Sequence, residues 1–153
     1  MNLVLENPEQ VAWYTDMAAT LRAMGVDPKD CNWYLSDIDA NGTMPLPEEG
    51  DGWVTGDALA ELLSKPIQFV WGVFSAFPPG VRVEVSRAPV ADGNRNLWYP
   101  PEASPQLPGA CFEVVCWDSS ATLLIGISQE QAAEFLRAFP GATLLSSRWP
   151  KEA

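Results

Sequence analysis

Histidine is absent from this sequence of 153 residues. Its absence excludes catalytic triads that contain His, a His general base and metal sites with His ligands. The three cysteines, Cys31, Cys111 and Cys116, form no CxxC pair and match no secreted disulfide pattern. No apolar run is long enough for a membrane helix, and no segment resembles a signal peptide. The sequence therefore favours a soluble, reduced, cytoplasmic protein.

Basic residues are scarce, with 9 Lys and Arg against 20 Asp and Glu, and the net charge is −11. No Lys or Arg lies between Lys29 and Lys65, whereas 8 acids do, so this interval carries −8 and the other 12 acids and 9 bases give −3. Such an excess of acid disfavours nucleic-acid binding and would attract a cation or a basic protein. A solvated acidic surface that keeps the protein soluble is the alternative.

Apolar residues, by contrast, are plentiful. They make up 47% of the chain and include 7 Trp. A chain of this length buries roughly 70% of the surface that its unfolded form exposes. We therefore expect a single globular domain over residues 1–153 that needs no disulfide, metal or other cofactor to fold.

Apolar periodicity and capping residues predict three helices. The first has Asn7 as its N-cap, starts at Pro8 and stops at Gly25. The second follows Thr55, and the third follows Ser128, which forms a capping-box pattern with Gln131. Strands are predicted at residues 32–39, 69–77, 81–85, 111–117, 121–127 and 143–149, with the fourth and fifth joined as a hairpin.

This order lacks a regular alternation of strand and helix, so we expect an α+β fold. Its sheet should be mixed or mainly antiparallel, with about five to six strands covered by about three helices. In the strand at residues 32–39, alternation would place Asp37 and Asp39 on the same face as Trp33 and Leu35.

Residues 88–109 contain five prolines and no clear helix or strand. Loops of this length are uncommon in small domains and often carry function, and the prolines favour a shaped loop. Trp98 and Tyr99 lie in it, and Trp53 follows another loop, so these aromatic side chains could form contacts with a partner. Trp71 and Trp117 are expected in the core because their strand neighbours are apolar.

Residues 37–48 match the pattern of an EF-hand calcium loop. The oxygen ligands would come from Asp37, Asp39, Asn41, Thr43 and Glu48. However, the preceding residues favour a strand, and Pro45 and Pro47 prevent a helix from leaving the loop. A turn that ends a strand is the favoured interpretation, and calcium binding is kept as a second hypothesis.

Paired carboxylates permit a third hypothesis, an acid–base hydrolase. Asp37 with Asp39, or Glu48 with Asp57, could form such a pair, although the sequence does not fix their separation. The cysteines have no His partner, and core packing is expected for Cys111 and Cys116.

Three segments, residues 33–39, 67–77 and 115–120, resemble small bacterial proteins of uncharacterised type. The acidic, Trp-rich and His-free character is also similar to that of immunity proteins, which neutralise basic toxins of interbacterial competition systems. This resemblance implies a tight heterodimer in which an acidic surface covers the cationic active site of a toxin. Electrostatic steering would speed their association.

The leading hypothesis is therefore a non-enzymatic acidic protein that binds a basic protein partner, such as a toxin. Neither nucleic acid nor a membrane is expected as a partner, and the sequence does not indicate an oligomeric state. The candidate contact residues are Asp37, Asp39, Glu48, Glu49, Asp51, Trp53, Asp57, Trp98 and Tyr99.

Overall fold

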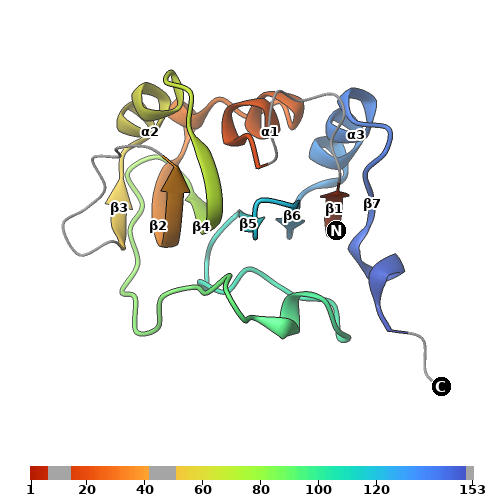
Figure 1. The fold of residues 1–153 in the computed structure, drawn as a ribbon. Helices are drawn as coiled ribbons and strands as arrows, with labels where there is room; N and C mark the ends of the chain where they lie inside the picture. The colour runs from red at the N-terminus through yellow and green to blue at the C-terminus, as the bar shows by residue number, and fades with distance from the viewer. Residues whose placement is uncertain (7–14, 42–50, 151–153) are drawn as a thin grey trace.

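The computed structural model describes residues 1–6, 15–41 and 51–150. Within these residues, one sheet contains seven strands in the order β3-β2-β4-β5-β6-β1-β7 (Figure 1). Every neighbouring pair is antiparallel. The strands are β1 Leu3–Glu6, β2 Asn32–Asn41, β3 Gly52–Val54, β4 Gln68–Phe77, β5 Phe112–Trp117, β6 Ala121–Ile125 and β7 Thr143–Leu144. Strands from both ends of the chain thus meet in the same sheet.

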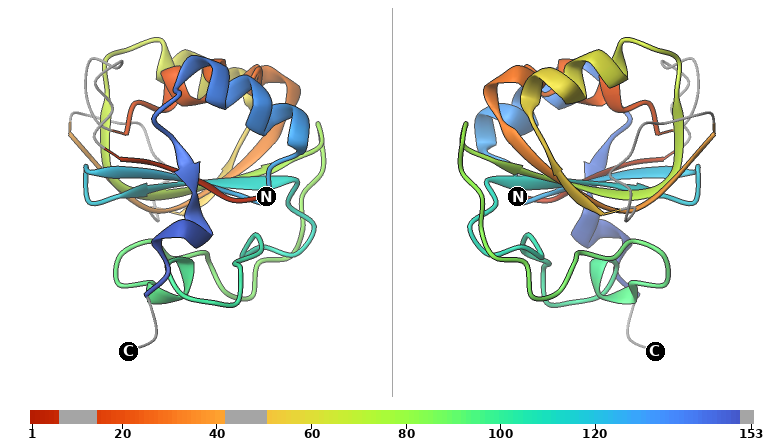
Figure 2. Two further views of the ribbon diagram at one scale, coloured as in Figure 1. Left: turned by 90° about the vertical axis from the view of Figure 1, so that its right-hand side faces the viewer. Right: turned by 90° about the vertical axis from the view of Figure 1, so that its left-hand side faces the viewer.

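The sheet lies between two unlike layers (Figure 2). The helices α1 Met17–Ala23, α2 Gly56–Leu63 and α3 Gln129–Ala138 cover one face. Residues 78–111, here called the loop layer, cover the other face and contain only the short 3-10 turn η2 Arg95–Leu97. Two more 3-10 turns are η1 Pro28–Asp30, before β2, and η3 Leu145–Arg148, after β7.

Both faces of the sheet are apolar, so each layer buries its own core. On the helix side, Trp33, Phe69 and Phe74 of the sheet pack with Leu21 of α1 and Phe135 of α3. On the loop side there are two smaller clusters, which include Tyr34, Val73, Phe77, Ala91, Leu97, Leu107, Val115 and Leu123. The loop layer therefore folds against the sheet through buried apolar side chains.

These observations confirm the α+β fold and the antiparallel sheet covered by three helices. The hairpin is also confirmed as β5 and β6, which pair from Glu113 with Ile125 to Trp117 with Ala121. The Thr55 hydroxyl accepts the N–H of Ala58 at the start of α2. The capping box of Ser128 and Gln131 is formed at the start of α3.

One predicted strand is wrong, and another is shorter than predicted. Residues 81–85 lie in the loop layer outside the sheet, where Val83 and Val85 pack against the cluster of Tyr34 and Phe77. The alternation of apolar residues correctly indicates that one face of this segment is packed. The segment packs, however, without pairing to a strand of the sheet. Of residues 143–149 only two join the sheet, because η3 follows at once. Instead, the short strands β1 and β3 complete the seven, and the prediction did not contain them.

The first helix begins later than predicted. Thr15 has a φ of 55° and Asp16 has an extended backbone, so no helix runs through them into α1. The Asp16 carboxylate accepts the N–H of Ala19 and is the N-cap, whereas the predicted cap Asn7 lies outside the described residues. Gly25, with a φ of 74°, follows the end of the helix as expected.

Candidate functional site

A bulge in β2 decides which face its aspartates occupy. The pairing of β2 with β4 shifts register between Ser36 and Asp39, and Asp37 has a φ of 54°. Ile38 therefore packs into the helix-side core, and Asp39 pairs with Trp71, which belongs to the loop side. The predicted placement of Asp37 and Asp39 beside Trp33 and Leu35 is wrong, because the extra residue of a bulge reverses the alternation.

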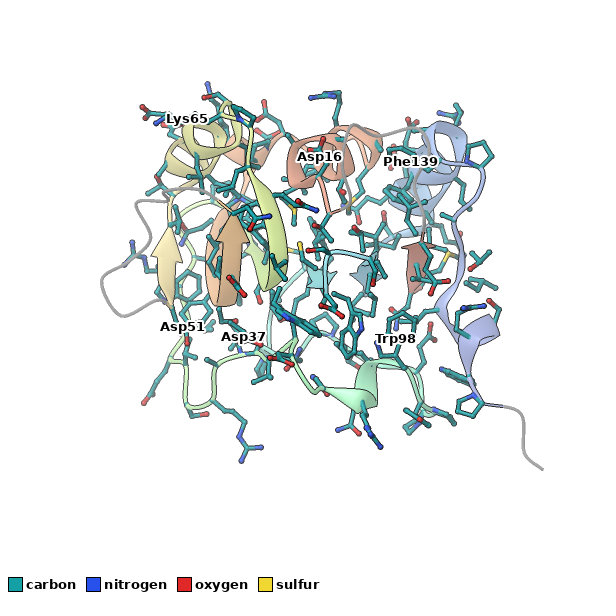
Figure 3. The ribbon with its side chains drawn as sticks, in the orientation of Figure 1. Asp16, Asp37, Asp51, Lys65, Trp98 and Phe139 are labelled. Atoms are coloured by element: carbon teal, nitrogen blue, oxygen red, sulfur yellow. The ribbon has the colours of Figure 1, made fainter. Side chains whose placement is uncertain are left out.

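The carboxylate of Asp37 anchors the loop layer to the sheet. Its Oδ2 accepts the backbone N–H groups of Ala91 and Asp92, each at 2.9 Å. The N–H of Asp37 itself donates to Oδ1 of Asp51 at 3.0 Å. Figure 3 shows Asp37 and Asp51 side by side below β2 and β3. Asp37 thus fixes the loop layer, and Asp51 holds the backbone of Asp37.

A second carboxylate, which the sequence analysis missed, fastens the same layer further along. Glu113 of β5 is fully buried, and its Oε2 accepts the Ser75 hydroxyl at 2.7 Å and the N–H of Leu107 at 3.1 Å. Its Oε1 accepts the N–H of Gln106 at 2.5 Å. Burial raises the pKa of Glu113, and these hydrogen bonds oppose that rise. The sequence feature that could have revealed Glu113 is that it is the single charged residue of the otherwise apolar strand Phe112–Trp117.

Three tryptophans form a row on the loop side of the sheet. The ring centroids of Trp71 in β4 and Trp117 in β5 are 5.0 Å apart, and those of Trp117 and Trp98 in the loop layer are 5.4 Å apart. Both contacts are edge-to-face. All three side chains are only partly buried, so Trp71 and Trp117 lie at the margin of the core rather than within it.

Two exposed acids border this tryptophan row. Asp39 pairs across the strands with Trp71, and Asp118 follows Trp117 in the tight turn between β5 and β6. The turn is fastened to β4 because the N–H of Ser119 donates to the carbonyl of Val70 at 2.9 Å. The structure thus places exposed acids beside indole rings on a fixed surface.

The other candidate contact residues are dispersed. Trp53 packs edge-on against Tyr34 and Phe77, and the guanidinium carbon of Arg82 lies 5.9 Å from the centre of its ring. Asp57 lies in the first turn of α2, in the layer on the opposite side of the sheet. Glu48 and Glu49 lie outside the described residues. Those acids of the interval that the structure describes therefore do not form one continuous face.

The calcium hypothesis gains no support from the part of the chain that is described. Asp37, Asp39 and Asn41 lie in β2, Asp37 already binds two backbone N–H groups, and Thr43 and Glu48 lie outside the described residues. No group of three potential metal ligands occurs in residues 1–6, 15–41 and 51–150. The hydrolase hypothesis likewise stays a prediction.

The cysteines differ from one another. Burial raises the pKa of Cys116, which lies in the core as expected. Cys111 is exposed in the loop layer immediately before β5, so its predicted core position is wrong. Burial, and then Cys111 and Asp30 nearby, raise the pKa of Cys31 to about 11. Cys31 and Cys116 therefore lack the low pKa of an activated thiolate.

No family model, curated protein or solved structure matches this chain. In the described ranges, none of the helices has the length and hydropathy required to cross a bilayer.

Proposed function

We propose that this chain is a non-enzymatic binding protein that recognises a basic protein through its tryptophan row and the acids beside it. The observation that supports the proposal is the row Trp71, Trp117 and Trp98, bordered by Asp39 and Asp118. A basic toxin, as the resemblance to immunity proteins implies, is the partner class that we expect.

Each component of this surface suits a cationic side chain. The face of an indole ring attracts an Arg or Lys side chain, with a gain of roughly 0.5–2 kcal/mol. A carboxylate at the border can pair with the same cation through a charge-assisted hydrogen bond. The side chains are only partly buried, so the rings present surface to a partner while they stay packed on one another.

Long-range electrostatics would assist the encounter. The net charge of −11 attracts a basic protein at a distance, and the effect weakens as salt screens it. Asp39 and Asp118 are exposed and have no ion pair with another described residue. They are therefore available to a partner, unlike Asp37, which holds the loop layer.

Charge neutralisation on the two faces of the protein tests this proposal. One variant carries Asp39→Asn and Asp118→Asn, and the matched control carries Asp57→Asn and Glu61→Gln on α2. All three proteins should have the same fold, and the two variants lose the same amount of negative charge. Each protein is immobilised and exposed to lysate of the native organism at low and high salt.

We expect the wild type and the α2 variant to retain the same basic protein at low salt and release it at high salt. The Asp39/Asp118 variant should retain less of it. With the partner purified, Trp98→Ala should weaken binding by about thirtyfold, as expected for an aromatic hot spot. Equal losses in the two charge variants, or retention of no basic protein, would contradict the proposal.

A further inference from the structure

The loop layer contains a hollow of about 480 Å³, here called the loop pocket. It lies on the side of the sheet that faces away from the helices, in the stretch that includes Trp98 (Figure 3). Its polar lining side chains are Asn94, Asn96, Tyr99, Glu102, Ser104 and Gln106. The remaining lining comes from Leu97, Ala103 and the two prolines that follow Tyr99.

Side-chain hydrogen bonds hold the walls of the loop pocket in place. The amide of Gln106 accepts the N–H of Val90 at 2.9 Å and donates to the carbonyl of Val90 at 3.0 Å. Asn94 donates to the same carbonyl at 2.9 Å, and Asn2 of the N-terminal strand region donates to the carbonyl of Ala103 at 2.7 Å. The pocket is therefore preformed, which lowers the entropy cost of binding a ligand.

Four of the lining side chains have no polar partner in the described part of the chain. Among the described residues, none forms a hydrogen bond or ion pair with the side chains of Asn96, Tyr99, Glu102 and Ser104. Tyr99 is 45% exposed, although it is a large aromatic residue in a layer whose Leu97 is buried. The pocket thus offers one aromatic ring for stacking and several polar groups that can fix the orientation of a ligand.

The chemistry of these groups selects the ligand. Amide and hydroxyl side chains both donate and accept hydrogen bonds, and a carboxylate accepts them, so the set matches the hydroxyl groups of a polyol. No Lys or Arg of the described residues lines the pocket, and Glu102 would repel an anion. The apolar face of a sugar ring can lie against an aromatic ring such as that of Tyr99.

We infer that the loop pocket binds a neutral saccharide, with Tyr99 as the stacking ring and Asn96, Glu102 and Ser104 as hydrogen-bond partners of its hydroxyl groups. This site goes beyond the proposed function, since it requires no protein partner. It also differs in location, because neither Trp71 nor Trp117 lines it.

The test is an NMR titration of the full chain, labelled with nitrogen-15, with maltose, lactose and chitobiose at millimolar concentrations. We expect at least one of these disaccharides to shift the backbone amide signals of residues 94–106. Tyr99→Ala should weaken that binding by about tenfold, and Asn96→Ala by a smaller factor. Arg22→Ala, on the helix side of the sheet, is the control and should bind as the wild type does.

The spectra of each variant report its folding, so weaker binding can be separated from unfolding. The inference is overturned if none of the three sugars shifts residues 94–106. It is also overturned if spermine shifts them and the sugars do not, since the ligand would then be a cation. Binding of equal strength in wild type and Tyr99→Ala would show that the sugar does not occupy this pocket.

Discussion

Glu113→Gln tests how strongly the loop layer depends on a buried carboxylate. Three donors converge on its two oxygens, the Ser75 hydroxyl at 2.7 Å and the N–H groups of Gln106 at 2.5 Å and Leu107 at 3.1 Å. Glutamine keeps the size of the side chain but replaces one acceptor oxygen with an NH2 group. If the amide oxygen stays with Ser75 and Leu107, the N–H of Gln106 faces another donor.

The cost follows from that one mismatch. A buried donor without an acceptor costs roughly 1–3 kcal/mol, and the lost hydrogen bonds to a charged group add to it. Removal of the buried charge offsets part of the cost, because a buried carboxylate carries its own desolvation penalty. We therefore expect Glu113→Gln to lower the free energy of unfolding by about 2 kcal/mol, or Tm by roughly 4–8 °C for a chain of this size.

Urea denaturation followed by tryptophan fluorescence measures this change, and Glu84→Gln at an exposed position of the loop layer is the control. The control should change the free energy of unfolding by less than about 0.5 kcal/mol. Amide hydrogen exchange should also become faster at Gln106 and Leu107 in Glu113→Gln. A variant as stable as the wild type, with unchanged exchange at these two amides, would refute the anchoring role.

Three further predictions concern pH, packing and thiol reactivity. Burial raises the pKa of Glu113 above its ordinary value of 4.5, so the folded state holds the proton more tightly than the unfolded state does. The wild type should then lose stability relative to Glu113→Gln as pH rises from about 4.5 through the raised folded pKa. If the stability advantage of the wild type over Glu113→Gln instead grows with pH, this prediction is contradicted. In Gly56→Ala, the added Cβ would lie 2.5 Å from a backbone carbonyl oxygen of η1. Calorimetry should therefore show that the free energy of unfolding falls by roughly 1–3 kcal/mol, despite the better helix propensity of alanine. The control Gly141→Ala, whose added Cβ has no atom within 4 Å, should be nearly neutral. Iodoacetamide should alkylate exposed Cys111 faster than Cys31, because a pKa of about 11 leaves roughly a thousandth of the Cys31 side chains as thiolate at pH 8. Equal alkylation rates of the two cysteines, measured by mass spectrometry, would disprove this.

The sequence predicts the parts of the fold in which local pattern and tertiary packing agree. The β5–β6 hairpin joins two apolar runs across a short polar turn, and α3 starts at a capping box with apolar residues on one face. The strands β1 and β3 were missed because they are short, and their pairing depends on distant partners. The bulge at Asp37 was missed because alternation assumes one residue for each partner on the neighbouring strand.

The candidate site is less predictable because its residues come from separate segments. Trp98 was singled out by its unusual loop, but Trp71 and Trp117 were assigned to the core from their apolar neighbours. Only the structure brings the three rings together. Hydrogen bonds from side chains to distant backbone groups, such as those of Glu113, leave no periodic pattern in a sequence.

The attachments of the loop layer also determine where the chain can change in length. Polar side chains of the sheet and its flanks hold the layer at residues 81, 91–92, 103 and 106–107. Ser86 and Arg87 are exposed and lie between the packed residues Val85 and Ala88, so a few residues inserted there would lengthen only a tethered segment, at an entropy cost below about 1 kcal/mol. An insertion between residues 103 and 107 would instead displace one anchor from the next. The exposed pair Ser86 and Arg87 is therefore a suitable position for grafting a tag or a second binding loop, and the stretch after Ala103 is not.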